Sequence, residues 1–140
     1  MSYKFFDHTA DVLFEANGKS LGELFEAAGL ATEETQADLK DIKQKIKKEI
    51  NLEKDNIEML LFDFLQELIF LKDAELLLFS NIKVSIKEKN KTYKLKAALK
   101  GEKLDQKKHN LKVDVKAVTL HRFEVKKTSN CWFARVILDI

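Results

Sequence analysis

Apolar and polar residues in the first third of the chain follow two different periods. The runs "SYKFF" and "VLFEA" are separated by the polar cluster "DHTAD", and the second run ends at the turn pair Asn17-Gly18. Such runs, bounded by turn residues, predict two short strands. Ser20 and Glu23 then form the S-x-x-E pattern of a helix N-terminus, and apolar residues recur at helical spacing behind it. The pattern predicts a helix over roughly residues 21–33.

The segment from Asp38 to Asp55 is compatible with two structures. Its apolar residues fit one stripe of a helix, and those in its second half also fit a charged strand with gaps. The periodicity slightly favours the strand. The apolar positions concerned are Leu39, Ile42, Ile46, Ile50 and Leu52.

A longer helix is predicted after this segment. Asp55 and Glu58 repeat the capping pattern in front of "NIEMLLFDFLQELIFLKD", whose apolar residues cover most of the helical circumference. A helix of this kind has to be covered by protein on most sides. Its narrower polar side, which faces solvent or a partner, carries Asp63, Gln66 and Glu67.

In the second half of the chain the period becomes two, which is typical of strands. A polar "KEKNK" turn separates two alternating runs and predicts a hairpin. Alternation returns in "LKVDVK" at residues 111–116, which predicts a further strand, and the run from Cys131 to Ile140 is expected to return antiparallel to it. The apolar positions of the hairpin are Ile82, Val84, Ile86, Tyr93, Leu95, Ala97 and Leu99.

This order of strands and helices predicts an α+β fold with two main helices and an antiparallel or mixed sheet. The 140 residues lie near the commonest size of one domain, and with no proline and four glycines the chain contains no segment of linker composition. We therefore expect a single domain over residues 1–140. Two blocks of strand, helix and strand hint at a loose internal duplication.

The charge balance changes the range of partners that we expect. Charged residues make up 34% of the chain, but the net charge is only +2, and the lysine clusters "DIKQKIKKEI" and "KEKNKTYKLK" contain acidic residues. Interleaved charges favour a solvated face over a nucleic-acid groove, so we expect no strong binding of nucleic acid. No apolar run is long enough to span a bilayer, and the amino terminus does not resemble a signal peptide. We expect no membrane association and a cytoplasmic location.

Few residues suggest enzymatic chemistry. The single Cys131 excludes an internal disulfide and a cysteine-based zinc site, and its position beside Trp132 and Phe133 predicts a small buried apolar residue. The sequence contains no glycine-rich phosphate loop, no G-x-S-x-G and no H-E-x-x-H. His109, in "DQKKHN", is interpreted as a turn residue.

Several carboxylates lie in unexpectedly apolar surroundings. Asp7 and Asp11 lie between two apolar strands, and Asp139 lies between Leu138 and Ile140 at the end of the sequence. Carboxylates are hard oxygen donors of the kind that Mg²⁺ and Ca²⁺ prefer, and a main-chain or terminal oxygen of Ile140 adds to the set. The competing interpretation is that Asp7 and Asp11 cap turns and that Asp139 is simply exposed.

The strand "VKAVTLH" carries a second candidate pair, Lys116 and His121. Strand alternation places Lys116 on the same face as Asp114. The competing interpretation is a solvated lysine. His8, between the first two strands, is interpreted as a residue that holds its loop by hydrogen bonds.

Five segments, taken in order, resemble the archease family over essentially the whole chain. They are "FFDHTADVLFEANGKSLGELFEAA", "IEMLLFDFLQELIFLKD", "GEKLDQKKH", "VKAVTLH" and "WFARVILDI". The resemblance implies a fold built of strand-helix-strand-strand (SHS2-like) modules. It also favours a strand over Ile46 to Leu52, where periodicity alone left two structures open.

The same resemblance implies an accessory protein rather than an enzyme. Archeases activate RtcB-type tRNA-splicing ligases by promoting GTP-dependent guanylylation and multiple turnover. The family's divalent-cation site, seen with calcium, matches Asp11, Asp139 and Ile140 here, with Mg²⁺ or Mn²⁺ as other possible ions. Asp7 and Lys116 match positions important for ligase activation. The alternatives are a chaperone of an RNA-modifying methyltransferase and a small metal-dependent hydrolase.

Overall fold

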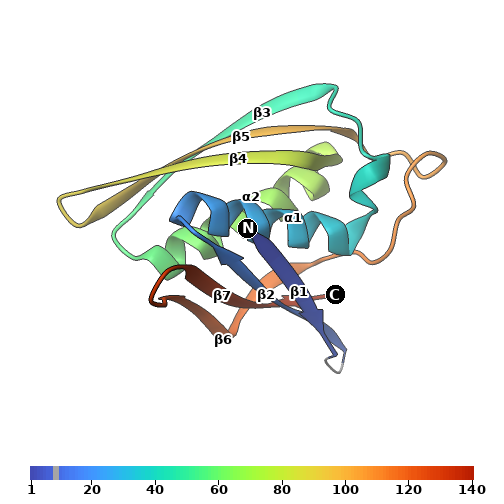
Figure 1. The fold of residues 1–140 in the computed structure, drawn as a ribbon. Coiled ribbons are helices and arrows are strands. Elements are labelled where there is room, and N and C mark those ends of the chain that lie inside the picture. Colours follow the sequence, from blue (N-terminus) through green and yellow to red (C-terminus); the bar gives the residue numbers. More distant parts are fainter. Residues whose placement is uncertain (8–9) are drawn as a thin grey trace.

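The computed structural model describes residues 1–7 and 10–140 of the chain. Seven strands, two α-helices and a short 3₁₀ helix follow one another in this part of the sequence (Figure 1). In chain order they are β1 (Ser2–Phe6), β2 (Asp11–Gly18), α1 (Leu21–Gln36), η1 (Leu39–Asp41), β3 (Ile46–Lys54), α2 (Ile57–Glu75), β4 (Leu77–Lys89), β5 (Thr92–Lys103), β6 (Ala117–Lys127) and β7 (Trp132–Asp139).

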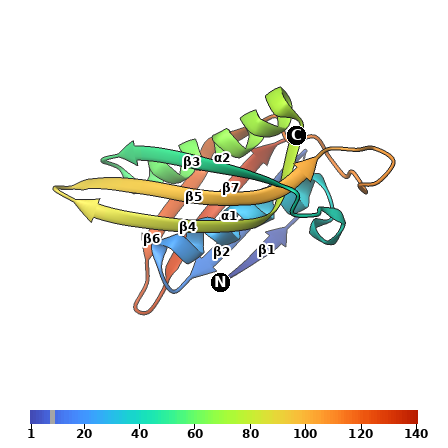
Figure 2. The same cartoon turned by 90° about the horizontal axis from the view of Figure 1, so that it is seen from above.

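The strands form two antiparallel sheets. One sheet has the order β1-β2-β7-β6 and the other the order β3-β5-β4. Figure 1 shows α1 and α2 lying between the two sheets, and Figure 2 shows the three-stranded sheet across the front of the helices. The predicted α+β class is therefore confirmed, with both sheets antiparallel. The strand predicted from the resemblance is also present, as β3.

Local sequence signals account for both helix starts. At α1 the Ser20 hydroxyl accepts a hydrogen bond from the Glu23 N–H at 3.2 Å, while the Glu23 carboxylate accepts one from the Lys19 N–H at 3.3 Å. The helix continues three residues beyond the predicted end, to Gln36. At α2 the prediction was wrong by one residue: Asn56, not Asp55, is the cap, because its side-chain oxygen accepts the Met59 N–H at 3.0 Å.

Large apolar side chains from every layer meet in one core around the helix pair. The rings of Phe25 in α1 and Phe64 in α2 lie 5.9 Å apart, and both side chains are fully buried. Phe14 of β2 closes the core on the four-stranded side and Phe79 of β4 on the three-stranded side. The polar side of α2 is only half exposed: the Gln66 side chain accepts the Val118 N–H at 2.8 Å and so holds β6.

The prediction of a strand over residues 111–116 is wrong. Only Leu111 forms a bridge, with Ala37, and the ladder of β6 begins at Ala117. The chain has to leave the three-stranded sheet after β5 and enter the four-stranded sheet at β6, so this segment crosses between the layers instead of joining either one. Of its three apolar residues, Val115 enters the core, whereas Leu111 and Val113 remain exposed.

Two further observations concern Cys131 and the membrane. Cys131 is half-buried rather than buried, since it precedes β7 in a turn where the Thr128 hydroxyl donates to its carbonyl at 3.0 Å. Among the described residues, no helix combines the length and apolar character that crossing a bilayer requires.

Candidate functional site

The register of the four-stranded sheet brings Asp11 and Asp139 together. Asp11 begins β2 and Asp139 ends β7, and the two residues are direct partners across the antiparallel ladder. Directly opposed residues of such a ladder point to the same face, with Cβ atoms about 4.5–5.5 Å apart. Residues 128 positions apart in sequence thus place two carboxylates side by side at one end of the sheet.

The neighbouring strand completes the surroundings of Asp139. Its partner on β6 is Ala117. The main-chain carbonyl of Asp139 accepts the Lys116 N–H at 2.8 Å, so Lys116 is held at the same end of the sheet with its side chain exposed. Ile140 follows directly and is half-buried against the core. The structure therefore brings together four of the five predicted site residues.

Asp7, the fifth, connects this end of the sheet to a groove. The groove encloses about 560 Å³ between β1, the end of α1 and the segment 111–116, and both Asp7 and Asp11 line it. Phe5 and Phe6 form an apolar part of its lining and remain 41% and 39% exposed. Asp139, Ile140 and Lys116 are not part of the groove lining. His8, which was expected to hold this loop, lies outside the described residues.

The backbone that leads into the carboxylate pair is strained. Ala10 has a φ of 64°, in the left-handed region that a residue with a Cβ adopts at a cost of about 1–2 kcal/mol. This conformation turns the chain into β2 directly before Asp11. Strain of this kind persists where the surrounding structure requires one backbone path.

The carboxylate pair fits a divalent cation on physical grounds. Like charges that lie directly opposite each other destabilise a sheet, and a cation between them removes that repulsion. Ca²⁺ accepts carboxylate, main-chain and water oxygens in a flexible geometry. Among residues 1–7 and 10–140, no cluster of three or more acidic, histidine or cysteine side chains is suited to a metal, so main-chain oxygen and water would have to complete the shell of any ion here.

A buried lysine that sequence reasoning missed holds the segment 111–116. The Lys72 ammonium donates to the Asp114 carboxylate and, at 2.8 Å, to the Val115 carbonyl, and it pairs with Asp73 at 2.8 Å. Burial by itself lowers the pKa of Lys72, but the bonds to Asp114 and Asp73 outweigh it and raise the pKa. Lys72 follows Leu68 by four residues, so helical periodicity places it on the buried face of α2. That spacing is the sequence feature that could have identified Lys72 as a buried lysine.

Glu33 is a second residue that the sequence reasoning missed. It is fully buried in α1, where its carboxylate accepts the Phe79 N–H of β4 at 2.9 Å. Burial raises the pKa of Glu33 to about 8, although the Phe79 bond and the charge of Lys72 oppose the shift. Its other carboxylate oxygen has no hydrogen-bond partner among the described residues. Glu33 therefore ties α1 to the three-stranded sheet.

His109 belongs to a turn, as predicted, but it is buried. Its Nδ1 accepts the Asp105 N–H at 2.9 Å, so Nε2 carries the hydrogen and donates to Glu102 at 3.0 Å. Burial would raise the pKa of Glu102, but bonds from Lys108, the Lys43 N–H and His109 together hold it at about 2. The His109 side chain has no exposed surface, so this pair supports the turn rather than a reaction.

The fold and the carboxylate pair define an α+β protein with a candidate oxygen-ligand cation site at one end of a sheet. Residues 3–140 match the model of the Archease protein family (MTH1598/TM1083). The archease of Pyrococcus abyssi is 37% identical over 139 residues, which cover 99% of this chain and 98% of that protein. The archease of Sulfolobus acidocaldarius is 39% identical over 138 residues, with the same coverage. The chain belongs to the archease family.

Two solved structures are similar to this one. The solution structure of Methanobacterium thermoautotrophicum protein 1598 has a TM-score of 0.88 and 38% identity, and the match covers 99% of this chain and 98% of that chain. The crystal structure of an archease from Thermotoga maritima, described as a possible chaperone, has a TM-score of 0.64 and 23% identity over 98% of this chain and 96% of that one, and it supports the fold alone. Family membership supports an accessory or chaperone-like role.

Proposed function

We propose that this protein activates an RtcB-type tRNA-splicing ligase, promoting GTP-dependent guanylylation of the ligase and its multiple turnover. The observation that carries the proposal is the direct opposition of Asp11 and Asp139 across the ladder of β2 and β7. Family membership makes an accessory role the appropriate class, and the opposed carboxylates supply a reason for such a protein to take up a divalent cation.

Each residue has a separate part in the proposal. Asp11, Asp139 and a main-chain oxygen of Ile140 would hold the cation, with calcium as the first choice and Mg²⁺ or Mn²⁺ as alternatives. When bound, such an ion supplies positive charge of the kind that phosphoryl and nucleotidyl transfer require. The main chain of Lys116 is held beside Asp139, since its N–H donates to the Asp139 carbonyl, and its exposed side chain would bring a positive charge to this end of the sheet. Asp7 lines the groove, and we expect it to contact the ligase there.

The first test replaces one carboxylate with an uncharged amide of nearly the same shape. In Asp139→Asn we expect the affinity for Ca²⁺, measured by titration calorimetry, to fall at least about tenfold, because even the loss of a residue that only supports a metal ligand costs that much. Stimulation of ligase guanylylation should fall in parallel. Asp55→Asn is the matched control, because Asp55 is an exposed aspartate outside the site.

Two outcomes would contradict the proposal. If Asp139→Asn stimulates purified ligase as well as the unmodified protein does, the site assignment is wrong. If the protein alone turns over GTP or RNA in the absence of ligase, the metal-dependent hydrolase becomes the better interpretation.

A further inference from the structure

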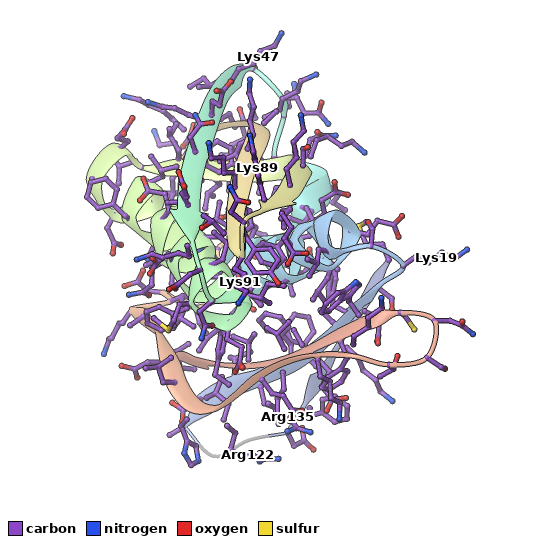
Figure 3. All side chains as sticks on the ribbon, turned by 90° about the vertical axis from the view of Figure 1, so that its left-hand side faces the viewer. Lys19, Lys47, Lys89, Lys91, Arg122 and Arg135 are labelled. Atoms are coloured by element: carbon purple, nitrogen blue, oxygen red, sulfur yellow. The ribbon has the colours of Figure 1, made fainter. Side chains whose placement is uncertain are left out.

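The outer face of the three-stranded sheet carries a concentration of lysines. Side chains of β3, β4 and β5 alternate between the helices and solvent, and the outward positions are marked by their exposure. Figure 3, seen from the side of the β4–β5 hairpin tip, shows Lys47 on the outer side of this sheet and Lys89 at the tip. We call these outward positions the lysine face; its lysines are Lys47, Lys83, Lys87, Lys89, Lys94, Lys96 and Lys100.

Strand alternation separates charges that are interleaved in the sequence. The lysine face holds seven lysines and the two acidic residues Glu49 and Glu53, a net charge of +5. The whole chain has a net charge of +2, so the remainder carries −3. Glu88 and Lys48 occupy the opposite set of positions, and Lys48 is paired there with Glu75 of α2. The net charge of the whole chain therefore does not indicate how unevenly charge is distributed over the surface.

The lysines repel one another where oppositely charged pairs would be more stable. Lys47 lies directly opposite Lys100, and Lys87 lies directly opposite Lys94. Like charges in such positions destabilise a sheet. On this face, the described residues form one ion pair within 4 Å, between Lys96 and Glu49 at 3.8 Å. The arrangement leaves most of the positive charge available to an external anion.

The shape of the face selects the kind of anion. β4 and β5 run side by side for twelve or more residues, roughly 40 Å at strand spacing. The outward positions contain no aromatic residue, since Tyr93 occupies an inward position, so bases cannot stack there. They also contain no large apolar residue that could enter a lipid bilayer. An extended, rigid row of ammonium groups fits a regular array of phosphates.

We propose that the lysine face binds the phosphate backbone of double-helical RNA without sequence preference. Lysine contacts to phosphates release counterions and contribute affinity rather than base recognition. Double-stranded RNA is recognised mainly through its shape, phosphates and 2′-hydroxyls, which suits a face without stacking groups. The choice of RNA over DNA rests on the proposed function, whereas the phosphate-binding face rests on the register and exposure of the lysines alone.

The test measures binding of the full chain to a fluorescent RNA duplex in the absence of any ligase. We expect affinity to fall steeply with salt, with a slope of about −4 in log K against log salt for some four or five phosphate contacts. The triple variant Lys83→Gln, Lys94→Gln and Lys96→Gln should bind at least about tenfold more weakly and reduce the slope by about three. The matched control is Lys19→Gln, Lys40→Gln and Lys107→Gln, which removes the same charge from exposed positions outside the face.

Three results would contradict RNA binding by the lysine face, and a fourth would contradict the proposed function alone. Equal loss of affinity in both triple variants would mean that net charge, not this face, attracts RNA. A slope near zero would exclude phosphate contacts. Binding to phosphatidylserine vesicles that is abolished by the face variant, without binding to RNA, would assign the face to a membrane. Failure of ligase stimulation with intact RNA binding would contradict the proposed function and leave the lysine face standing.

Discussion

Burial of Glu33 in α1 couples its protonation to folding. A fully buried carboxyl with a pKa of about 8 is protonated in the folded protein at pH values where the unfolded chain, with a pKa near 4.5, is ionised. The folded state therefore binds more protons between these values, and stability falls as the pH rises from about 4.5 to about 8. Over this pH range the full shift lowers the free energy of unfolding by roughly 4–5 kcal/mol.

Glu33→Gln tests this coupling. Glutamine keeps an oxygen to accept the Phe79 N–H but does not titrate. We expect the free energy of unfolding, measured with urea, to be higher for Glu33→Gln than for the unmodified protein at high pH. The difference between the two proteins should grow by several kcal/mol from pH 5 to pH 9. A difference that stays constant over this range would show that Glu33 is not buried as a neutral acid.

At the scale of elements, the segment 111–116 depends on single contacts rather than on a ladder. Leu111 bridges to Ala37, the Lys112 N–H donates to the Gln36 carbonyl at 2.9 Å, and Lys72 holds Asp114 and the Val115 carbonyl. This segment delivers Lys116 to the end of β7. The arrangement of the candidate site therefore depends on Lys72 of α2.

Lys72→Met should loosen this segment while filling its space with a similar apolar chain. We expect loss of about 1–3 kcal/mol of stability, because the Val115 carbonyl loses its buried charged donor. Amide exchange should accelerate at Lys112 and Lys116, and the affinity for Ca²⁺ should fall several-fold because Asp139 loses a fixed neighbour.

A matched variant distinguishes this effect from a general loss of charge. Lys48→Met removes the half-exposed pair with Glu75 and should leave exchange in the segment unchanged. Unaltered exchange at Lys112 and Lys116 in Lys72→Met would show that the other contacts suffice to hold the segment.

At the scale of the molecule, both sheets depend on one helix pair. α1 packs on β2 in one sheet and on β4 in the other, and α2 packs on β3 and β6 (Figure 1). Neither sheet has a buried core without these helices, so the two sheets should unfold together. The single domain over residues 1–140 stays a prediction, and its test is cooperativity.

The single tryptophan makes that test direct. Trp132 lies in β7 of the four-stranded sheet, so its fluorescence reports on that layer, whereas far-ultraviolet circular dichroism reports on all layers. We expect both signals to follow the same urea transition, with one midpoint and one slope. Separate midpoints would show two independently stable layers and contradict the single-domain expectation.

The fold was predictable where the signal is local. The capping box of Ser20 and Glu23, the apolar circumference of α2 and the alternation around the "KEKNK" turn each identified an element, because the residues involved contact one another within a few positions. The cap at Asn56 instead of Asp55 differs by one residue, since both side chains can accept a helix N–H. The prediction of a strand over 111–116 failed because apolar residues alternate there in sequence, although only Val115 is buried and Leu111 and Val113 are exposed.

The candidate site was predictable only in its residue types. Apolar neighbours marked Asp11 and Asp139 as unusual, and the resemblance singled them out, but their contact depends on a ladder between residues 128 positions apart. Nothing local indicates that Glu102 and His109 form a buried pair, because each depends on how the turn folds back on β5.

By itself the sequence determined the helices, most strands, the α+β class and the family, since these follow from spacing along the chain. Tertiary structure alone decided which carboxylates face each other, which lysine holds the segment 111–116 and how charge divides between surfaces. The physical reason is the same in each case. Strand register and the packing of sheets on helices set distances between residues remote in sequence, and electrostatic interactions depend on those distances.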